Sequence, residues 1–316
     1  MTPPVSNLSN PTGNAYAQLI SALHHSDLEG STILEIDILP SSHSPQLLYE
    51  HPALALPKGL LIQLYLTARK LLFSHLASPR EETYDAALKA TSIVLLWDPN
   101  HLTAANFRKR YIRSLSSTWA ENGYAEEDGR RLTDAVQREL RFLDSLLTSP
   151  LNKHAKASTL WGQRLWIMQN FWAQALEDSS SVEGDTPNKA TIKRIMSHWD
   201  YELSIVMKAA ERHPRNYYAW QYARQLLQLV DGELSPQMKG IRVESLGKAH
   251  QWCLMHPRDV SGWGFLVFLM ASEETVDGDS DGRRIVRETR EWVRKYEWEG
   301  ESVEWFLKAV GQLQLG

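Results

Sequence analysis

The chain has little of several features that would place it in a specialised class. Its 316 residues include one cysteine, Cys253, so no disulfide framework can form within the chain, and a reducing compartment fits. The longest apolar runs, such as residues 264–271, are too short to span a bilayer. The formal net charge is only −4, which argues against a general binder of polyanions.

The two ends of the sequence also lack familiar signals. Residues 1–13 are rich in Pro, Ser and Asn, without the basic-then-apolar pattern of a signal peptide. Residues 314–316 do not form a lipidation box. We therefore expect a soluble, cytoplasmic protein with no membrane span and no nucleic-acid partner.

Tryptophan, in contrast, is abundant, and three of the twelve tryptophans stand in a recurring segment. The segment occurs four times, at residues 98–109, 154–164, 213–224 and 256–265. Six residues after a proline-equivalent position, the last three copies carry Trp161, Trp220 and Trp263, and the first carries Ala105. These anchors lie 56, 59 and 43 residues apart, which predicts a stacked helical array.

Helical periodicity dominates from residue 57 onward. One expected helix face carries Val136, Leu140, Leu143 and Leu147. The helices come in pairs, and the second helix of a pair carries the recurring segment. We expect these second helices to begin at Pro99, Pro214 and Pro257, because proline presets φ and needs no N–H partner at a helix start.

The N-terminal part of the sequence follows a different pattern. Residues 1–30 look like a flexible tail, and residues 34–38 alternate between apolar and acidic side chains, as in a strand. A short hairpin with residues 46–49 would extend that strand. We expect a single repeat domain over residues 31–316.

The recurring segment resembles the α-subunit repeat of protein prenyltransferases, whose pattern is roughly Pro-x-Asn-Tyr-x-x-Trp-x-x-Arg-Arg. The third copy matches best, with Pro214, Asn216, Tyr217, Trp220 and Arg224. The other matching positions are Pro99, Arg108, Trp161, Arg164, Pro257 and Trp263. Segments at 35–40, 153–169 and 255–262 are similar to a divergent subgroup, the prenyltransferase α-subunit repeat-containing proteins. The likeness covers about residues 33–272.

The copies also depart from the pattern. Ala105 replaces the first tryptophan, Ala223 stands at the first arginine position of the third copy, and Leu266 and Val267 replace both arginines of the fourth. The tryptophans are interpreted as structural residues, each a large aromatic side chain that locks a helix pair.

The resemblance implies an all-α fold, a right-handed α–α superhelix in which helical hairpins form a crescent around a separate β subunit. In that family the β subunit holds zinc and most of the lipid pocket, and the enzyme joins a client cysteine thiolate to an isoprenoid with loss of diphosphate. The α subunit lends a cation and a tyrosine from the start of a motif helix. Arg215 and Tyr217 match these catalytic positions, and Asn216 is expected to cap or brace the turn.

The chain lacks the family's Asp-x-Cys zinc ligands, since Gln251 and Trp252 precede Cys253. Zinc is therefore expected on the β subunit, with an isoprenoid diphosphate as co-substrate and no cofactor on this chain. The resemblance implies the α subunit of a heterodimeric protein prenyltransferase of geranylgeranyl type, inactive alone. Its partners would be a β subunit like that of Rab geranylgeranyltransferase and a client protein. The alternative is a helical-repeat adaptor without transferase activity.

One loop matches the formula of an EF-hand calcium site. The candidate ligands are Asp277, Asp279, Asp281 and Glu288. Arg284 occupies the position that is usually apolar, and no second loop follows. We therefore favour a solvated acidic turn before a helix that starts near Asp281.

Basic residues and histidines give further weak signals. Residues 108–113 predict a polar helix face that faces an acidic partner, in preference to nucleic acid. The pair His24 and His25 suggests a metal, but lies in the expected tail. Three histidines near the motif helices are assigned to turn hydrogen bonds: His154, His213 and His256.

Overall fold

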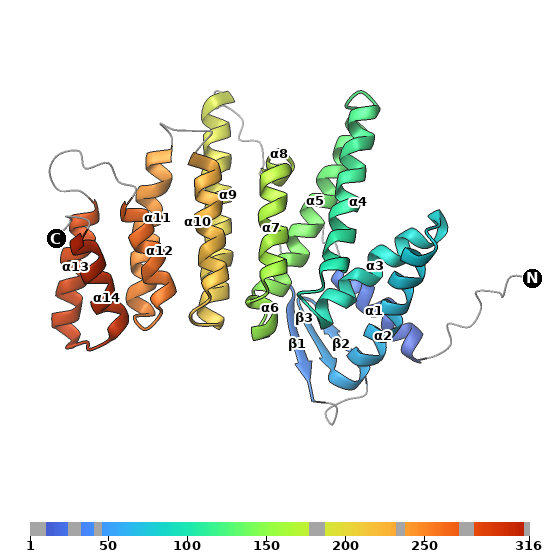
Figure 1. The fold of residues 1–316 in the computed structure, drawn as a ribbon, viewed down its shortest axis with the longest axis horizontal. Coiled ribbons are helices and arrows are strands. Elements are labelled where there is room, and N and C mark those ends of the chain that lie inside the picture. The colour runs from blue at the N-terminus through green and yellow to red at the C-terminus, as the bar shows by residue number, and fades with distance from the viewer. Residues whose placement is uncertain are drawn as a thin grey trace, which may run out of the picture. The chain divides into compact units, whose positions relative to one another are not determined.

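The computed structural model describes residues 11–24, 33–40, 46–176, 187–231, 238–271 and 281–312. Within these ranges the chain forms fourteen helices and one three-stranded sheet (Figure 1). It divides into two compact units, Met1–Asp178 and Ser179–Gly316. The expected helical-repeat class is confirmed. The handedness and curvature of a superhelix, and a single domain over residues 31–316, stay predictions.

Unit 1 contains the sheet and the first eight helices. Its strands are β1 (Glu35–Leu39), β2 (Leu48–Glu50) and β3 (Ala53–Pro57). Its helices are α1 (Pro11–Leu23), α2 (Lys58–Ala77), α3 (Glu81–Trp97), α4 (Leu102–Glu121), α5 (Glu126–Leu147), α6 (Asn152–Ala155), α7 (Ser158–Asn170) and α8 (Trp172–Leu176).

The small sheet confirms a strand where residues 34–38 alternate, but corrects the expected hairpin. Strand β3 lies in the middle, parallel to β1 and antiparallel to β2. Thus β2 folds back on β3 because only residues 51 and 52 separate the two strands, whereas eight residues separate β1 from β2. The Leu34 N–H donates to Ser145 Oγ at 3.1 Å, which ties the strand to α5.

The described residues 11–24 are not the flexible tail that we expected for residues 1–30. They form helix α1, which packs on α2 and α3. Leu19, Ala22 and Leu23 are buried, so an apolar face holds the helix in place. The rest of the expected tail lies outside the described residues.

The helical hairpins of unit 1 follow the apolar stripes of the sequence. The stripe of α5 is buried along its length, at Leu132, Val136, Leu140, Leu143 and Leu147. Helix α3 packs on α4, α4 on α5, and α5 on α7. Helix α5 therefore lies between the first and second copies of the recurring segment, and its polar side chains can reach both.

Unit 2 consists of three helical hairpins. Their helices are α9 (Pro187–Arg212), α10 (Tyr217–Asp231), α11 (Met238–Met255), α12 (Val260–Ala271), α13 (Asp281–Tyr296) and α14 (Glu301–Gln312). Aromatic rings join the pairs: Trp220 lies 5.0 Å from Trp252 and 5.1 Å from Phe265, measured between ring centroids. Trp263 lies 4.7 Å from Phe306 in the same way. These contacts agree with the structural role expected for Trp220 and Trp263.

The motif helices do not begin at proline. Pro99, Pro214 and Pro257 each lie in the turn, three residues before α4, α10 and α12 begin. The residue before each helix is a side-chain cap instead, which accepts a backbone N–H that the helix leaves unpaired. The caps are His101, Asn216 and Asp259.

No helix in the described part of the chain combines the length and the apolar character that a membrane crossing requires.

Candidate functional site

A buried asparagine, Asn216, lies just before α10. In the sequence it stands between Arg215 and Tyr217, the two candidate catalytic residues. Asn216 is completely buried, and its Oδ1 accepts the Ala219 N–H at 3.3 Å. This cap agrees with the bracing role expected for Asn216. Because Asn216 points inward, the residues on either side of it, Arg215 and Tyr217, are exposed.

The backbone of Arg215 adopts a conformation that is uncommon for a residue with a side chain. Its φ is 60°, in the left-handed region. Its N–H donates to Asp259 Oδ2 at 2.6 Å. The Arg215 guanidinium forms no hydrogen bond or ion pair with another described residue, so its charge is available to a ligand or partner.

Asp259 joins the third copy of the recurring segment to the fourth. The residue is 3% exposed, and its Oδ1 accepts the N–H groups of Ser261 at 2.9 Å and Gly262 at 3.1 Å. One carboxylate therefore caps α12 with one oxygen and holds Arg215 with the other.

Tyr217 lies beside a second arginine of the same copy. Its side chain is 57% exposed, and its ring meets Tyr218 edge-on. Burial lowers the pKa of the Arg224 guanidinium, and the nearby Tyr217 phenol opposes this effect in part. Arg224 also lies over Phe268, with 6.0 Å from Cζ to the ring centroid. The start of α10 thus combines a free cation, a phenol and a partly buried arginine.

Arg215 lines an apolar groove with a volume of about 400 Å³. Its other walls include Pro214, Pro257 and Trp298, and Arg258 lies over the Trp298 ring at 5.7 Å. A helix N-terminus favours an anion, and Arg215 adds a full positive charge. This arrangement suits a ligand or partner in which a negative group adjoins an apolar one.

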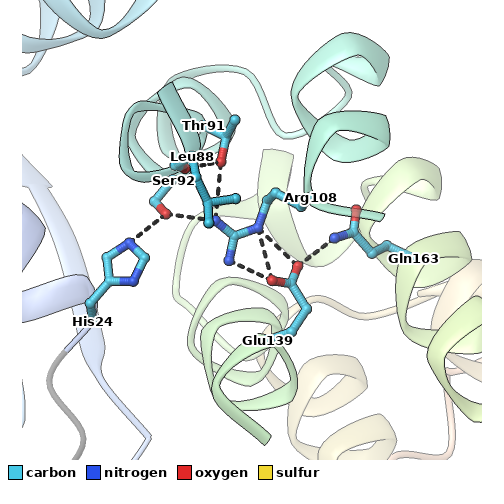
Figure 2. Close-up of polar contacts among 7 residues, drawn as sticks. All are labelled: His24, Leu88, Thr91, Ser92, Arg108, Glu139 and Gln163. Carbon is cyan, nitrogen blue, oxygen red and sulfur yellow. Dashed lines mark hydrogen bonds and ion pairs between the residues drawn. The ribbon is translucent and has the colours of Figure 1, made fainter. Parts of the chain in front are cut away.

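In unit 1 the motif arginines are buried and paired instead. Figure 2 shows Arg108 between α3 and α5, where its Nε donates to Glu139 Oε2 at 2.9 Å and its Nη1 to Ser92 Oγ at 2.9 Å. Gln163 from α7 donates to the same carboxylate, and Thr91 accepts from Arg108 at 3.1 Å. Arg108 is therefore part of the core, which corrects its assignment to a polar helix face.

Arg164, from the second copy, has an equally buried partner. Its Nη1 donates to Asp144 Oδ1 at 2.5 Å, and both side chains are at most 1% exposed. Trp161 from the same helix donates its indole N–H to the Ala155 carbonyl at 2.8 Å. Both motif residues therefore have structural roles.

The remaining basic residues of α4 lie on its outer face. Arg110 and Arg113 are exposed, and Lys109 is half-buried. Lys109 and Arg113 approach the same Trp166 ring, at 5.3 and 5.2 Å from its centroid. The expectation of an acidic partner for this face stays a prediction.

The histidines fall into two groups. His24 hydrogen-bonds Ser92 at 2.9 Å, and burial, followed by the charge of Arg108, lowers its pKa to about 4. His256 donates to the Trp252 carbonyl at 2.9 Å, four residues earlier, as expected for a turn bond. His154 donates instead to the Leu96 carbonyl of α3 at 2.7 Å, 58 residues away, which corrects its assignment to a turn bond. His213 is buried, and His25 lies outside the described residues.

The calcium-loop match is only partly within the described residues. Asp277 and Asp279 lie outside them, whereas Asp281 begins α13 as expected. Arg284 binds both remaining candidates, at 2.9 Å to Asp281 and 3.2 Å to Glu288. Internal ion pairs therefore occupy these two carboxylates. Within the described ranges no three Cys, His, Asp or Glu side chains converge as a metal site.

Cys253 is buried in unit 2. Burial, and in second place the charge of Asp259, raises the pKa of its thiol well above the usual value. At neutral pH the group is a thiol, and thiolate is the form that attacks or binds metal.

Comparison with known proteins supports the resemblance seen in the recurring segments. The family named ECM9 middle domain matches residues 160–289. Protein prenyltransferase alpha subunit repeat-containing protein 1-B of Xenopus laevis is 27% identical over 188 residues, which are 60% of this chain and 38% of that protein. The human protein of the same name, without the suffix, is 27% identical over 188 residues, 60% of this chain and 40% of its own.

A named transferase subunit is also similar. Geranylgeranyl transferase type-2 subunit alpha of Saccharomyces cerevisiae is 26% identical over 141 residues, 44% of this chain and 31% of that protein. The chain is therefore related to protein prenyltransferase α-subunit proteins, as its motif copies predict. It spans about two fifths of the length of the repeat-containing relatives.

Sequence reasoning missed the partners of the motif residues. Glu139 and Asp144 of α5 bind the two unit 1 arginines, and Asp259 binds Arg215. For α5 the sequence held a signal that a cationic partner was needed. Glu139 adjoins Leu140 on the buried stripe, where an unpaired carboxylate would be costly. No comparable signal pointed to Asp259, whose bond to Arg215 depends on how two turns approach each other.

Proposed function

We propose that this chain is the α subunit of a heterodimeric protein prenyltransferase of geranylgeranyl type. A β subunit like that of Rab geranylgeranyltransferase would bind it and supply zinc and most of the lipid pocket. The α subunit would shape the surface that receives the client protein in the cytoplasm. Its relation to a geranylgeranyl transferase type-2 α subunit supports this assignment.

The observation that carries the proposal is the exposed Arg215 guanidinium, which has no partner among the described residues. The reaction develops negative charge on the leaving diphosphate, so a fixed cation lowers the barrier. Arg215 would stabilise that charge, and the Tyr217 hydroxyl would donate a hydrogen bond to a diphosphate oxygen. A residue needed only for packing would be buried and paired, as Arg108 and Arg164 are.

The test compares Arg215→Ala with wild type in the purified complex with the β subunit. Geranylgeranyl and farnesyl diphosphate are offered separately, with a client that ends in cysteines. We expect geranylgeranyl transfer, and we expect the variant to lower kcat by roughly ten- to a thousandfold, the range of a single electrostatic contact. Arg290→Ala, an exposed arginine of α13 outside the groove, is the matched control and should change kcat little.

Two results would contradict the proposal. One is an intact complex without transfer of either lipid, which favours the adaptor. The other is equal kcat values for wild type and Arg215→Ala, which removes the proposed role of this arginine. Binding of the β subunit, measured for each variant, separates loss of chemistry from loss of assembly.

A further inference from the structure

Resting on the proposed function, we infer that Asp259 is the positioning residue for Arg215. Its carboxylate holds the Arg215 backbone in the left-handed conformation from which the guanidinium meets the anion. Turnover should therefore depend on Asp259, although Asp259 itself does not contact the substrate.

The backbone conformation of Arg215 requires a stabilising contact. A residue with a Cβ loses energy in the left-handed region, so Arg215 needs an external contact to remain there. The contact is the 2.6 Å bond from its N–H to Asp259 Oδ2, and charge-assisted hydrogen bonds of this kind are among the stronger ones.

The Asp259 carboxylate is held rigidly in place. Asp259 is 3% exposed and its other oxygen receives two N–H groups of α12, so the carboxylate cannot turn away without leaving these donors unpaired. The Arg258 carbonyl beside it accepts the Ser302 hydroxyl at 3.2 Å, which anchors the turn to α14. Arg215 is thus held against a braced turn of the neighbouring hairpin.

Asp259 has two roles, capping α12 and binding the Arg215 N–H, and substitution can separate them. Serine is a good helix cap, but its side chain is one atom shorter. Asp259→Ser should therefore keep the cap of α12 and lose the bond to Arg215. Asp259→Asn also keeps a capping oxygen, but then turns an NH₂ group toward the Arg215 N–H.

The experiment is a double-mutant cycle in the complex with the β subunit, using wild type, Asp259→Ser, Arg215→Ala and the double variant. We expect Asp259→Ser to lower kcat roughly ten- to a hundredfold, which is the equivalent of one lost hydrogen bond to a charged group. The KM for the client and the affinity for the β subunit should stay unchanged. In the Arg215→Ala background Asp259→Ser should cause no further loss, since the two residues act as one.

Equal losses of kcat from Asp259→Ser in both backgrounds would show a general structural role and overturn the inference. The inference would also be overturned if Asp259→Ser left kcat unchanged while Arg215→Ala lowered it. If Asp259→Ser does not fold, Asp259→Asn is put through the same cycle. If the wild-type complex transfers no lipid, the proposed function fails. A crystal structure of the Asp259 variant then decides the positioning claim, because Arg215 retaining φ near 60° would contradict it.

Discussion

The two units contain the same kind of helical hairpin but stabilise it by different contacts at one motif position. In unit 1 the first arginine position of the motif holds Arg108 and Arg164, each buried against a carboxylate of α5. In unit 2 the same position holds Ala223 and Leu266, which are buried apolar side chains. A hairpin of this kind therefore needs a filled and satisfied contact at that place, and either an ion pair or apolar packing provides it.

The difference also changes what each unit leaves exposed. Unit 1 uses its motif arginines inside the fold, whereas unit 2 presents Arg215 outward at a motif turn. Turn-to-turn bonds exist in both units: Asn100 accepts the Thr159 N–H at 3.3 Å, and Asp259 accepts the Arg215 N–H at 2.6 Å. Of these two bonds, the second holds a residue whose charged side chain has no partner in the described part of the chain.

The largest expected effect comes from breaking one buried ion pair. Asp144→Ala leaves the Arg164 guanidinium buried without its carboxylate, and we expect a loss of about 3–5 kcal/mol in unfolding free energy. Urea denaturation measures it. The matched control is Asp85→Ala, which removes an exposed ion pair with Lys89 and should cost less than about 1 kcal/mol.

A variant in which unit 1 resembles unit 2 tests whether apolar packing can replace the ion pair. Replacing the whole pair, Arg164→Met with Asp144→Leu, should recover most of the loss, because apolar side chains of similar volume often substitute for a buried pair. A double variant as unstable as Asp144→Ala would show that apolar packing cannot replace the ion pair at this position.

The next effect is a pH dependence that belongs to unit 1. Burial, with a smaller effect of the Lys153 charge, lowers the pKa of His154 to about 4. The unfolded chain, with a pKa near 6.5, takes up the proton first, so stability is lost as the pH falls from 6.5 toward 4. The effect of this one group reaches about 3 kcal/mol.

His154→Gln should flatten that dependence, because glutamine can still donate to the Leu96 carbonyl but does not titrate. Unfolding free energies at several pH values between 4 and 7 provide the measurement. His51→Gln, at an exposed position, is the control. Equal slopes for wild type and His154→Gln would exclude a protonation penalty at this site.

The smallest effect separates the three motif tryptophans. Trp161 and Trp263 donate their indole N–H to the carbonyl six residues earlier, at 2.8 and 3.1 Å, whereas the Trp220 N–H has no acceptor among the described residues. Replacement by phenylalanine should therefore cost about 1–2 kcal/mol more at Trp161 than at Trp220. Thermal unfolding of the two variants measures the difference in stability. An equal loss would show that the indole hydrogen bond does not contribute.

The sequence predicted the features that depend on local pattern. Helical stripes, the hairpin order and the cap at Asn216 follow from spacing and residue type. The pairing of β2 with β3 was missed, because alternation identifies a strand without its neighbour. Helix α1 was missed because it begins in a segment rich in Pro, Ser and Asn, and its apolar face is buried by α2 and α3, which are distant in sequence.

The candidate site was predicted in part for the same reason. A motif position singles out Arg215 and Tyr217, and their exposure agrees with a role toward a ligand or partner. The bond between Arg215 and Asp259 joins residues 44 positions apart, and such a contact depends on how two hairpins pack. Arg108, in contrast, looked like part of a basic surface until α5 placed a carboxylate beside it.

The most direct measurement mixes the purified chain with the β subunit of Rab geranylgeranyltransferase and determines their stoichiometry by sedimentation at micromolar concentration. We expect a complex of one chain with one β subunit, because an α subunit has its function only in that assembly. Two separate species at these concentrations would contradict it.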